Sequence, residues 1–370
     1  MSKPTAISLF SGMGGDTLGL TQGGFDVIAF NEYDPSAIES HMANFPNSKL
    51  ICDPSQKKPK DRNDITKIPD AIFAEYKDKV DLIFAGHPCQ GFSQGGKKLP
   101  DDPRNTLFRE FARVTKIISP KFIIGENVDG LLSRKTSSGE KYFDVIVKEF
   151  NDLGYDVYHK VCNVVQYGVP QLRKRLIYVG VRNDLGKTFH FPDVLNDGKN
   201  NLPDLREIVQ FSMEGAIQIF PDDFDMNSIP NECILTDMDN HDFQSEYVHP
   251  YLTLKAKTRN AQYNGVLHYQ TLSFAKRDSP IHAEIVDIRY PSKTIICSYD
   301  HQPRLFIPLR NHIGFFIRPF TNYELKQIQG FPTHFIIHGN TKQQIKQIGN
   351  AAPPTLILLI VNFGVLPLLQ

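Results

Sequence analysis

Short apolar runs alternate with helical stretches through the first 185 residues, and this alternation limits the possible folds more than any other feature of the sequence. The apolar runs are rich in β-branched or aromatic residues, as buried parallel strands are. They occupy residues 6–10, 27–30, 82–85, 122–125 and 176–181. Helical stretches between them include 106–118 and 142–153, and Gly154 stands where a C-cap would end the second. The sequence therefore predicts an α/β fold with a doubly wound sheet, which binds ligands beyond the carboxyl ends of its strands.

The alternation fades after about residue 183, and from there the charges separate along the chain. Residues 191–250 hold 13 acidic and 2 basic side chains, whereas residues 251–310 hold 9 basic and 4 acidic ones. The whole chain is neutral, with 41 residues of each sign, which excludes a globally cationic binder but not a local basic surface for nucleic acid. We expect a first domain at 1–185, a smaller domain at 186–315 and a return to the first domain at 316–370.

Five cysteines lie far apart in the chain, and none belongs to a Cys-x-x-Cys pair. This spacing indicates neither a zinc site nor a disulfide framework. The first ten residues lack the features of a signal peptide, and the longest apolar run, 355–369, is short for a membrane span and is interrupted by polar and helix-breaking residues. We expect a cytoplasmic protein with no bound metal and no membrane partner.

A glycine-rich turn, Phe10-Ser-Gly-Met-Gly-Gly15, follows the first expected strand and precedes a helix. Glycines at such a turn let the backbone approach a ligand and expose helix N-terminal amides. A dinucleotide fingerprint needs a third glycine where Thr17 stands, so the turn favours a nucleoside cofactor without a pyrophosphate. Glu32 ends the second strand, where a carboxylate would accept hydrogen bonds from ribose hydroxyls, and Tyr33 beside it could lie against an adenine. A tight turn with an exposed surface acid is the alternative.

A cysteine lies in the loop Gly-His-Pro-Cys-Gln-Gly-Phe-Ser at 86–93, directly after the expected strand at 82–85. Doubly wound folds place reactive groups at such strand ends, and a thiolate is a strong nucleophile. Most single cysteines are buried and inert, but a loop constrained by proline and glycine at this position makes Cys89 a candidate nucleophile.

Two charged motifs stand at other strand ends. A Glu-Asn-Val sequence begins at Glu126, and burial there would raise the pKa of its carboxyl and let it donate a proton to a ring nitrogen. A Gln-Leu-Arg-Lys-Arg sequence enters the last strand, and alternation along an extended segment points Gln171, Arg173 and Arg175 to one side. Paired guanidinium groups suit a phosphate or a carbonyl oxygen. A helix N-cap acid and a solvated basic cluster are the alternatives.

The four motifs together, in this order, resemble those of the DNA (cytosine-5)-methyltransferase family, as found in bacterial restriction-modification enzymes. Further segments within 1–182 and 316–362 look like the family's blocks. They are Asp64-Ile65, Asp-Pro-Arg-Asn-Thr-Leu-Phe at 102–108, Arg-Pro-Phe-Thr at 318–321, Gln-Gly-Phe-Pro at 329–332, and Gln-Ile-Gly-Asn-Ala-Ala-Pro-Pro at 347–354. The resemblance implies an S-adenosyl-L-methionine-dependent methyltransferase fold with a smaller target-recognition domain. It also implies a monomer that acts on double-stranded DNA, either in a restriction-modification system, without contacting a companion endonuclease, or as an orphan methylase.

The resemblance further implies a mechanism. In the family, a cysteine thiolate adds to C6 of a cytosine, C5 then takes the methyl group of S-adenosyl-L-methionine, and loss of the C5 proton and of the cysteine restores the ring. By position, Cys89 is the nucleophile and Glu126 contacts N3 and the exocyclic amine. Arg175 contacts the cytosine O2, and Arg173 supports Glu126 or a phosphate. The residues that would meet the cofactor are Phe10, Gly12, Gly14, Gly15, Glu32, Tyr33, Asp64, Ile65, Pro88, Leu107 and Asn350.

The target cytosine must leave the stacked duplex before this chemistry, at a cost of a few kcal/mol. We expect the loop at 91–104 to form a lid whose Lys97, Lys98 and Arg104 reach phosphates, with a plain lysine-rich surface loop as the alternative. In the middle region, we place 191–250 mainly away from DNA and the basic segment at 251–310 toward the groove. Its candidate DNA contacts are Lys255, Lys257, Arg259, Lys276, Arg277 and Arg289, with Arg259, Asn260, Gln262 and Asn264 as candidates for base readout.

Three other functions stay open. An RNA-methylating branch shares this fold and cysteine, but its Cys-Phe-Thr signature is absent here. A non-catalytic DNA-binding protein on the same scaffold would have no need of Cys89, Glu126 and Arg175 together. A nicotinamide oxidoreductase would share the sheet, but Thr17 and the absence of a hydride-transfer motif argue against it.

Overall fold

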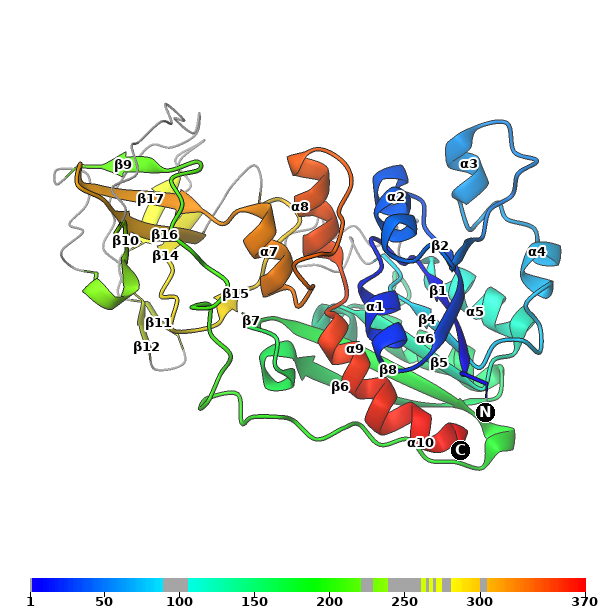
Figure 1. Ribbon diagram of the computed structural model, residues 1–370. Helices are drawn as coiled ribbons and strands as arrows, with labels where there is room; N and C mark the ends of the chain where they lie inside the picture. Colours follow the sequence, from blue (N-terminus) through cyan, green and yellow to red (C-terminus); the bar gives the residue numbers. More distant parts are fainter. Residues whose placement is uncertain are drawn as a thin grey trace.

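The computed structural model describes residues 2–88, 106–220, 229–238, 285–299 and 305–370, and between 261 and 284 it describes the backbone of strands alone. Figure 1 shows one sheet with its helices at one end of the molecule and a second sheet at the other end. Helices α7 (Asn322–Ile328) and α8 (Thr341–Asn350) lie between them.

The first sheet has seven strands in the order β3–β2–β1–β4–β5–β8–β6. In chain order they are β1 (Thr5–Leu9), β2 (Asp26–Asn31), β3 (Lys49–Leu50), β4 (Leu82–Ala85), β5 (Phe122–Asn127), β6 (Tyr155–Asn163) and β8 (Lys174–Arg182). The first five strands in the sheet order run parallel to one another. Every residue of β4 and β5 is buried, because helices cover both faces of the sheet.

The strand predicted at 176–181 runs antiparallel, so classing it with the parallel strands was wrong. It belongs to β8, which pairs antiparallel with both β5 and β6. β8 is antiparallel because it follows β6 along the chain and pairs with it. The apolar pattern did not reveal β6, an edge strand, because seven of its nine residues are at least partly exposed. The short connection at 164–173 joins β6 to its antiparallel neighbour without a crossover helix.

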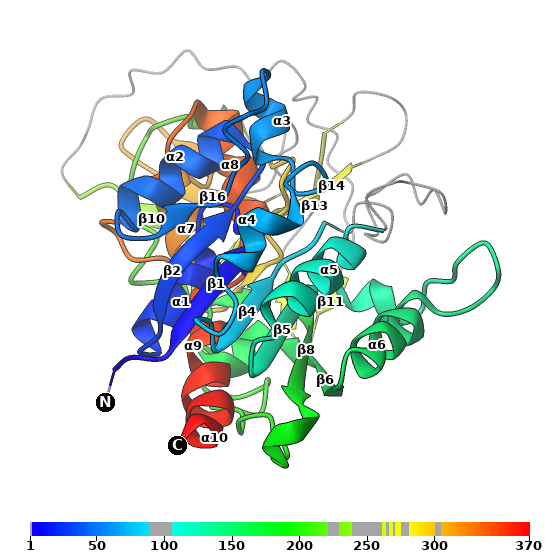
Figure 2. The ribbon, with the colours of Figure 1, turned by 90° about the vertical axis from the view of Figure 1, so that its right-hand side faces the viewer.

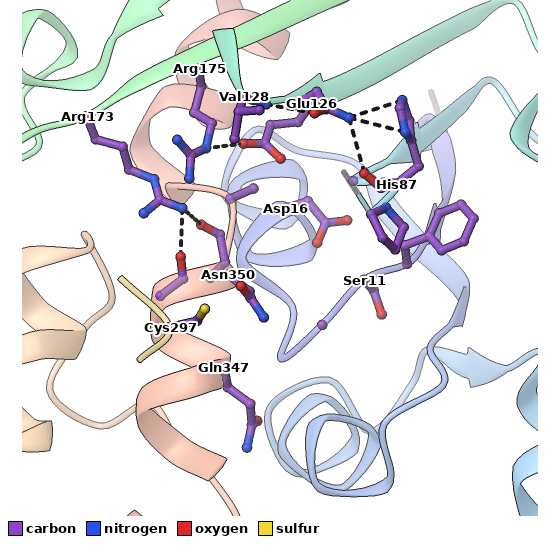
Figure 3. Close-up of a pocket in the computed structure, with 18 of the residues that line it drawn as sticks. Ser11, Asp16, His87, Glu126, Val128, Arg173, Arg175, Cys297, Gln347 and Asn350 are labelled. Carbon is purple, nitrogen blue, oxygen red and sulfur yellow. Dashed lines mark hydrogen bonds and ion pairs between the residues drawn. The ribbon is translucent and has the colours of Figure 1, made fainter. Parts of the chain in front are cut away.

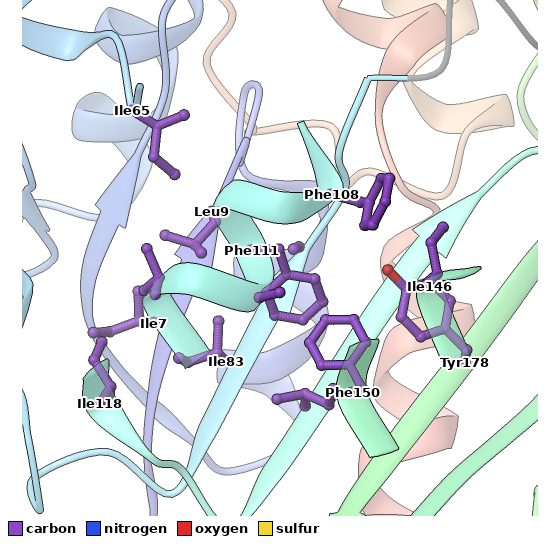
Figure 4. Packing of buried hydrophobic residues seen from close by; sticks show 14 of the residues in the cluster. Ile7, Leu9, Ile65, Ile83, Phe108, Phe111, Ile118, Ile146, Phe150 and Tyr178 are labelled. Atoms are coloured by element: carbon purple, nitrogen blue, oxygen red, sulfur yellow. The ribbon is translucent and has the colours of Figure 1, made fainter. Parts of the chain in front are cut away.

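Helices cover both faces of the first sheet (Figure 2). On one face lie α5 (Phe108–Ile118) and α6 (Tyr142–Asp152), where Phe111, Phe150 and Tyr178 pack with ring centroids 4.9–6.5 Å apart (Figure 4). On the other face, α1 (Gly15–Gln22) packs against α9 (Pro354–Ile360). The remaining helices before β4 are α2 (Pro35–Asn44), α3 (Pro59–Asn63) and α4 (Asp70–Ala74).

The C-terminal segment Thr341–Leu369 is long and apolar enough to cross a membrane by length and composition alone. It is divided in the structure into α8, α9, a π-helical turn (Val361–Val365) and α10 (Leu366–Leu369). Leu356 and Ile357 are fully buried in the core of the first sheet. A methyl group added to Gly19 of α1 would lie 2.5 Å from the Pro354 carbonyl oxygen, so the two helices meet at their backbones. This close packing makes α9 a core helix of the first sheet.

The second sheet has the order β13–β14–β16–β17–β9, with β10 paired to β16. Its strands are β9 (Ile217–Ile219), β10 (Leu235–Thr236), β13 (Thr271–Phe274), β14 (Ile281–Ile285), β16 (Leu305–Arg310) and β17 (Phe315–Pro319). Two shorter pairs are β11 (Ala261–Tyr263) with β12 (Val266–His268), and β7 (Gln171–Leu172) with β15 (Ser292–Lys293). Single 3-10 turns occur at Asp129–Leu132, Val164–Tyr167, Asn183–Leu185 and Asn231–Cys233. The chain leaves this second sheet after β17, a few residues beyond the return expected at residue 316.

A shared core joins the two ends of the molecule. Met13, from the glycine-rich turn, is buried in one cluster with Leu205 of the middle region and with Leu325 and Ile348 of α7 and α8. The glycine-rich turn is therefore packed between the first sheet and the C-terminal helices, which holds it at the edge where ligands bind.

Candidate active site

A cleft of about 2700 Å³ lies at the carboxyl ends of β1, β2, β4 and β5. Its walls also include the connection between β7 and β8, the segment 294–298 and the junction of α8 with α9. A pocket for one small ligand commonly measures about 300–1,000 Å³, so this cleft has room for a cofactor and a second group.

The glycine-rich turn and Glu32 form one wall of the cleft. Gly12 has a φ of +54°, and no atom lies within 4 Å of the position that a Cβ would take, so open space borders this backbone. The Gly12 amide donates to Glu32 Oε2 at 2.7 Å, and the amides of Tyr33 and Asp34 donate to Oε1 at 2.7 and 2.8 Å. Burial raises the pKa of Glu32, whereas the hydrogen bonds from these three amides lower it, and the effect of burial is the larger. A fixed carboxylate beside an open glycine turn fits the ribose and nucleoside part of an S-adenosyl group.

Nine of the eleven predicted cofactor residues line the cleft: Phe10, Gly12, Glu32, Tyr33, Asp64, Ile65, Pro88, Leu107 and Asn350. Gly14 and Gly15 do not line it. A Cβ on Gly14 would lie 2.6 Å from the Phe45 ring, and one on Gly15 would lie 2.2 Å from the Ala352 carbonyl oxygen. These two glycines therefore permit the start of α1 to pack closely against its neighbours. The sequence motif alone does not distinguish a glycine needed for such packing from one that contacts a ligand.

His87 anchors the chain directly before the predicted nucleophile. Its Nε2 lies 3.0 Å from the Tyr178 hydroxyl on β8, and the Asn127 side-chain amide donates to its carbonyl oxygen at 3.2 Å. Burial lowers the pKa of His87 to about 4, so the imidazole is neutral near pH 7. Sequence reasoning missed this role because the partner residues lie 40 and 91 positions away in the chain.

Glu126 and Arg175 form an ion pair in the cleft (Figure 3). Arg175 Nε lies 2.6 Å from Glu126 Oε1, and their side chains are 13% and 10% exposed. The pairing of β5 with β8 places Glu126 opposite Ile177, two residues along the strand from Arg175. The sequence predicted that Arg173 would support Glu126, but in the structure Arg175 makes this contact. The pair leaves a carboxyl group fixed in orientation and facing the cleft.

Arg173 is buried and its guanidinium is bonded to the protein backbone, which argues against the predicted phosphate contact. Its residue is 1% exposed, and its guanidinium donates to the carbonyl oxygens of Ile295 and Gly349 at 3.1 and 2.8 Å. Figure 3 shows these bonds reaching the backbone beside Asn350. Arg173 therefore ties the connection before β8 to the middle region and to α8.

The middle region departs from its predicted charge layout in two places. Residues 197–200, in the acidic segment placed away from DNA, line the cleft, because the Leu195 amide donates to the Gln166 carbonyl oxygen at 2.8 Å. Arg289, predicted to face a DNA groove, instead pairs with Asp287 at 2.8 Å and with Glu232 at 3.0 Å. Net charge per segment did not show which charges neutralise one another.

Several predicted residues lie outside the described residues. They are Cys89, Lys97, Lys98, Arg104, Lys255, Lys257, Arg259, Asn260, Asn264, Lys276 and Arg277, together with the side chain of Gln262. Within the described ranges, no cluster of three His, Cys, Asp or Glu side chains could hold a metal ion. The four cysteines described there are free thiols.

Comparisons with known proteins identify the family of this chain. The family model for C-5 cytosine-specific DNA methylase matches residues 5–362. Type II methyltransferase M1.HphI from Haemophilus parahaemolyticus is 32% identical over 365 residues, which cover 97% of this chain and 86% of that protein. Type II methyltransferase M.FnuDI from Fusobacterium nucleatum is 31% identical over 359 residues, which cover 96% and 92%.

Solved structures show the same fold. A putative DNA modification methyltransferase encoded within an E. coli prophage has a TM-score of 0.58 at 22% identity, with 97% of both chains covered. A DNMT2 variant from Spodoptera frugiperda has a TM-score of 0.63 at 16% identity, with 99% of this chain and 100% of that chain covered.

The family match and the α/β fold together define the class as S-adenosyl-L-methionine-dependent methyltransferases. The match over nearly the whole chain then shows that this chain belongs to the C-5 cytosine-specific DNA methylase family. It is a DNA (cytosine-5)-methyltransferase, and its methyl donor is S-adenosyl-L-methionine. The family, fold class, activity and cofactor predicted from the sequence are thereby confirmed.

Proposed function

We propose that this protein is the modification enzyme of a bacterial Type II restriction-modification system. It acts in the cytoplasm as a monomer and methylates C5 of one cytosine within a specific duplex sequence, without contacting a companion endonuclease. The names of the relatives support the restriction-modification role. The observation that carries the site assignment is the ion pair of Glu126 with Arg175 in the cofactor cleft, one strand away from the chain leading to Cys89.

The chemistry follows from the residues at these strand ends. The Cys89 thiolate adds to C6 of a flipped cytosine, and Glu126, which takes up a proton from solvent before this step, donates it to N3, so that no anion develops on the ring. Arg175 keeps the Glu126 carboxyl directed into the cleft. When bound, S-adenosyl-L-methionine supplies the methyl group that C5 accepts. Loss of the C5 proton to solvent then returns an electron pair to the ring, the C6–S bond breaks to release the thiolate, and the N3 proton returns to Glu126.

The target is recognised by the region around the second sheet, which we assign to residues 186–315. That region shares a buried core with the glycine-rich turn and α8, so it is held beside the cleft. Residues 197–200 line the cleft from this side. A cytosine flipped from duplex DNA would enter between this region and the first sheet.

The proposed function is tested by the position of the transferred methyl group. Duplex DNA incubated with the enzyme and methyl-labelled S-adenosyl-L-methionine should carry label on C5 of cytosine. DNA from a methylation-free host expressing the enzyme should show the modification within one sequence. Label on N4 of cytosine, on adenine or on RNA alone would contradict the proposal.

Replacing Glu126 by glutamine should lower kcat about a hundredfold or more, because an amide cannot transfer a proton to N3 while it keeps the size of the side chain. Affinity for S-adenosyl-L-methionine should stay near the wild-type value, since Glu32 and Gly12 hold a different wall of the cleft. Glu110→Gln is the matched control: Glu110 pairs with Arg113 at 2.7 Å on α5, outside the cleft, and its loss should leave kcat unchanged. Wild-type turnover in E126Q would refute the assignment.

A further inference from the structure

Asp16 is a buried carboxylate on the cleft wall that the proposed mechanism does not use. It is the second residue of α1, is 2% exposed and lines the cleft. The Ser8 hydroxyl on β1 donates a hydrogen bond to its Oδ2. Figure 3 shows the Asp16 carboxylate in the cleft between Glu126 and Ser11. A neutral hydroxyl is an unusual sole side-chain partner for a carboxylate in this position, because it brings no compensating charge.

In the part of the chain that the structure describes, no lysine or arginine forms an ion pair with Asp16. Removing an unpaired carboxylate from water costs several kcal/mol, so such a group takes up a proton or requires a cation. Burial raises the pKa of Asp16 to about 7, against the effect of hydrogen bonds from Ser8 and from the backbone amides of Thr17 and Asp16, and the negative charge of Glu126 adds a smaller rise. Asp16 is therefore close to half protonated at neutral pH.

Within the described ranges, no charged side chain that lines the cleft pairs with Asp16, although Lys60, Lys174 and Lys199 also line it. Arg175 is paired with Glu126, Arg173 is bonded to carbonyl groups, and the imidazole of His87 is neutral. The groups that face the cleft around Asp16 are Glu126 on β5, Arg175 on β8, Arg173 before β8, Glu32 after β2, His87 after β4, and Lys346 on α8 in its 2.7 Å pair with Asp34. A cationic ligand would supply the charge that these side chains do not.

We propose that Asp16 is the counter-charge for the cationic methyl donor. S-adenosyl-L-methionine carries a sulfonium and an ammonium group, and either would favour the ionised form of Asp16. Binding of the donor should therefore release the proton that Asp16 holds in the free enzyme. The inference rests on the assignment of this cleft to the family's cofactor, and it adds a residue that senses the charge of that cofactor.

The sign of the pH dependence follows from this linkage. Below pH 7, the donor must displace a proton from Asp16, so its affinity should rise with pH and level off once Asp16 is ionised in the free enzyme. With the midpoint near 7, the Kd should fall by about tenfold between pH 6 and pH 8. Asp16→Asn keeps an acceptor for Ser8 but carries no charge. The variant should therefore bind S-adenosyl-L-methionine more weakly than wild type does at pH 8, and its Kd should be nearly independent of pH.

Calorimetric titration of the DNA-free enzyme with S-adenosyl-L-methionine, in two buffers of different ionisation enthalpy at pH 6.5, tests the inference. Wild-type enzyme should release roughly half to one proton per donor bound. D16N should release none. Asp81→Asn is the matched control, because Asp81 lies outside the cleft and its pair with Lys121 lowers its pKa, so D81N should release protons as wild type does.

A parallel titration with S-adenosyl-L-homocysteine, which has the ammonium but no sulfonium, identifies the group that Asp16 faces. Weaker binding of both compounds by D16N would support the ammonium, and weaker binding of the methyl donor alone would support the sulfonium. Wild-type binding without proton release would overturn the inference, and this result needs no variant to fold. Because DNA is absent, failure to methylate C5 would not affect this titration. Failure to bind the donor would refute the cleft assignment, and the Asp16 inference with it.

Discussion

Replacing Cys89 by alanine should abolish methyl transfer, with a loss of at least about ten-thousandfold in kcat, because the variant lacks the thiolate that we propose adds to C6 and activates C5. Donor affinity should be nearly unchanged. Gly12 and Glu32, which we propose hold the donor's nucleoside part, lie beyond β1 and β2, whereas the chain leading to Cys89 leaves β4. The measurement is methyl incorporation into duplex DNA, beside calorimetric Kd values for the donor.

The same variant gives a direct test of the covalent step. Duplex DNA with 5-fluorocytosine at the target should trap wild-type enzyme as a covalent adduct, because the C5 fluorine cannot leave as a proton does, and C89A should form none. Cys233→Ala is the matched control: burial raises the pKa of Cys233 to about 12, so that thiol is not a nucleophile and its loss should leave the adduct intact. An adduct in C89A, or none in an otherwise active wild-type enzyme, would refute the assignment.

The fold was predictable where strands are buried on both faces. β4 and β5 are fully buried, so their sequences are continuous apolar runs that stand out from the helices around them. β6 lies at the sheet edge with most of its residues partly exposed, and no such run marks it. The direction of β8 depends on β6, so the pattern that located residues 176–181 could not give their orientation.

The site was predictable where one short motif carries the function, and less so where distant contacts decide it. Glu126 stands at the end of its strand by sequence alone, and the structure places it in the cleft. Alternation put Arg173 and Arg175 on one side, but the bonding partners of Arg173 lie more than 120 residues away. The burial that shifts the pKa of Asp16 likewise arises from tertiary packing, which no local pattern reveals.

Replacing Arg173 by alanine should lower the stability of the folded protein by about 4 kcal/mol. The variant leaves the carbonyl oxygens of Ile295 and Gly349 without their donors in a buried site, and it removes a large side chain that is 1% exposed. Each buried acceptor left unpaired costs about 1–3 kcal/mol, and the cavity adds to this. Thermal unfolding followed by circular dichroism should show a midpoint lower by roughly 5–10 °C.

Arg175→Ala is the matched control, because it removes the same side chain two residues further along the same segment. Arg175 lies at the cleft, where its partner Glu126 can take up a proton once the arginine is lost, so the midpoint should fall less while methyl transfer falls steeply as the carboxyl loses its orientation. The two arginines of one motif should thus separate stability from catalysis. If R173A unfolds as wild type does and loses only turnover, Arg173 acts on the substrate as the sequence motif first suggested. If R173A instead unfolds at a clearly lower temperature than wild type, Arg173 stabilises the packing of the first sheet against the middle region and α8.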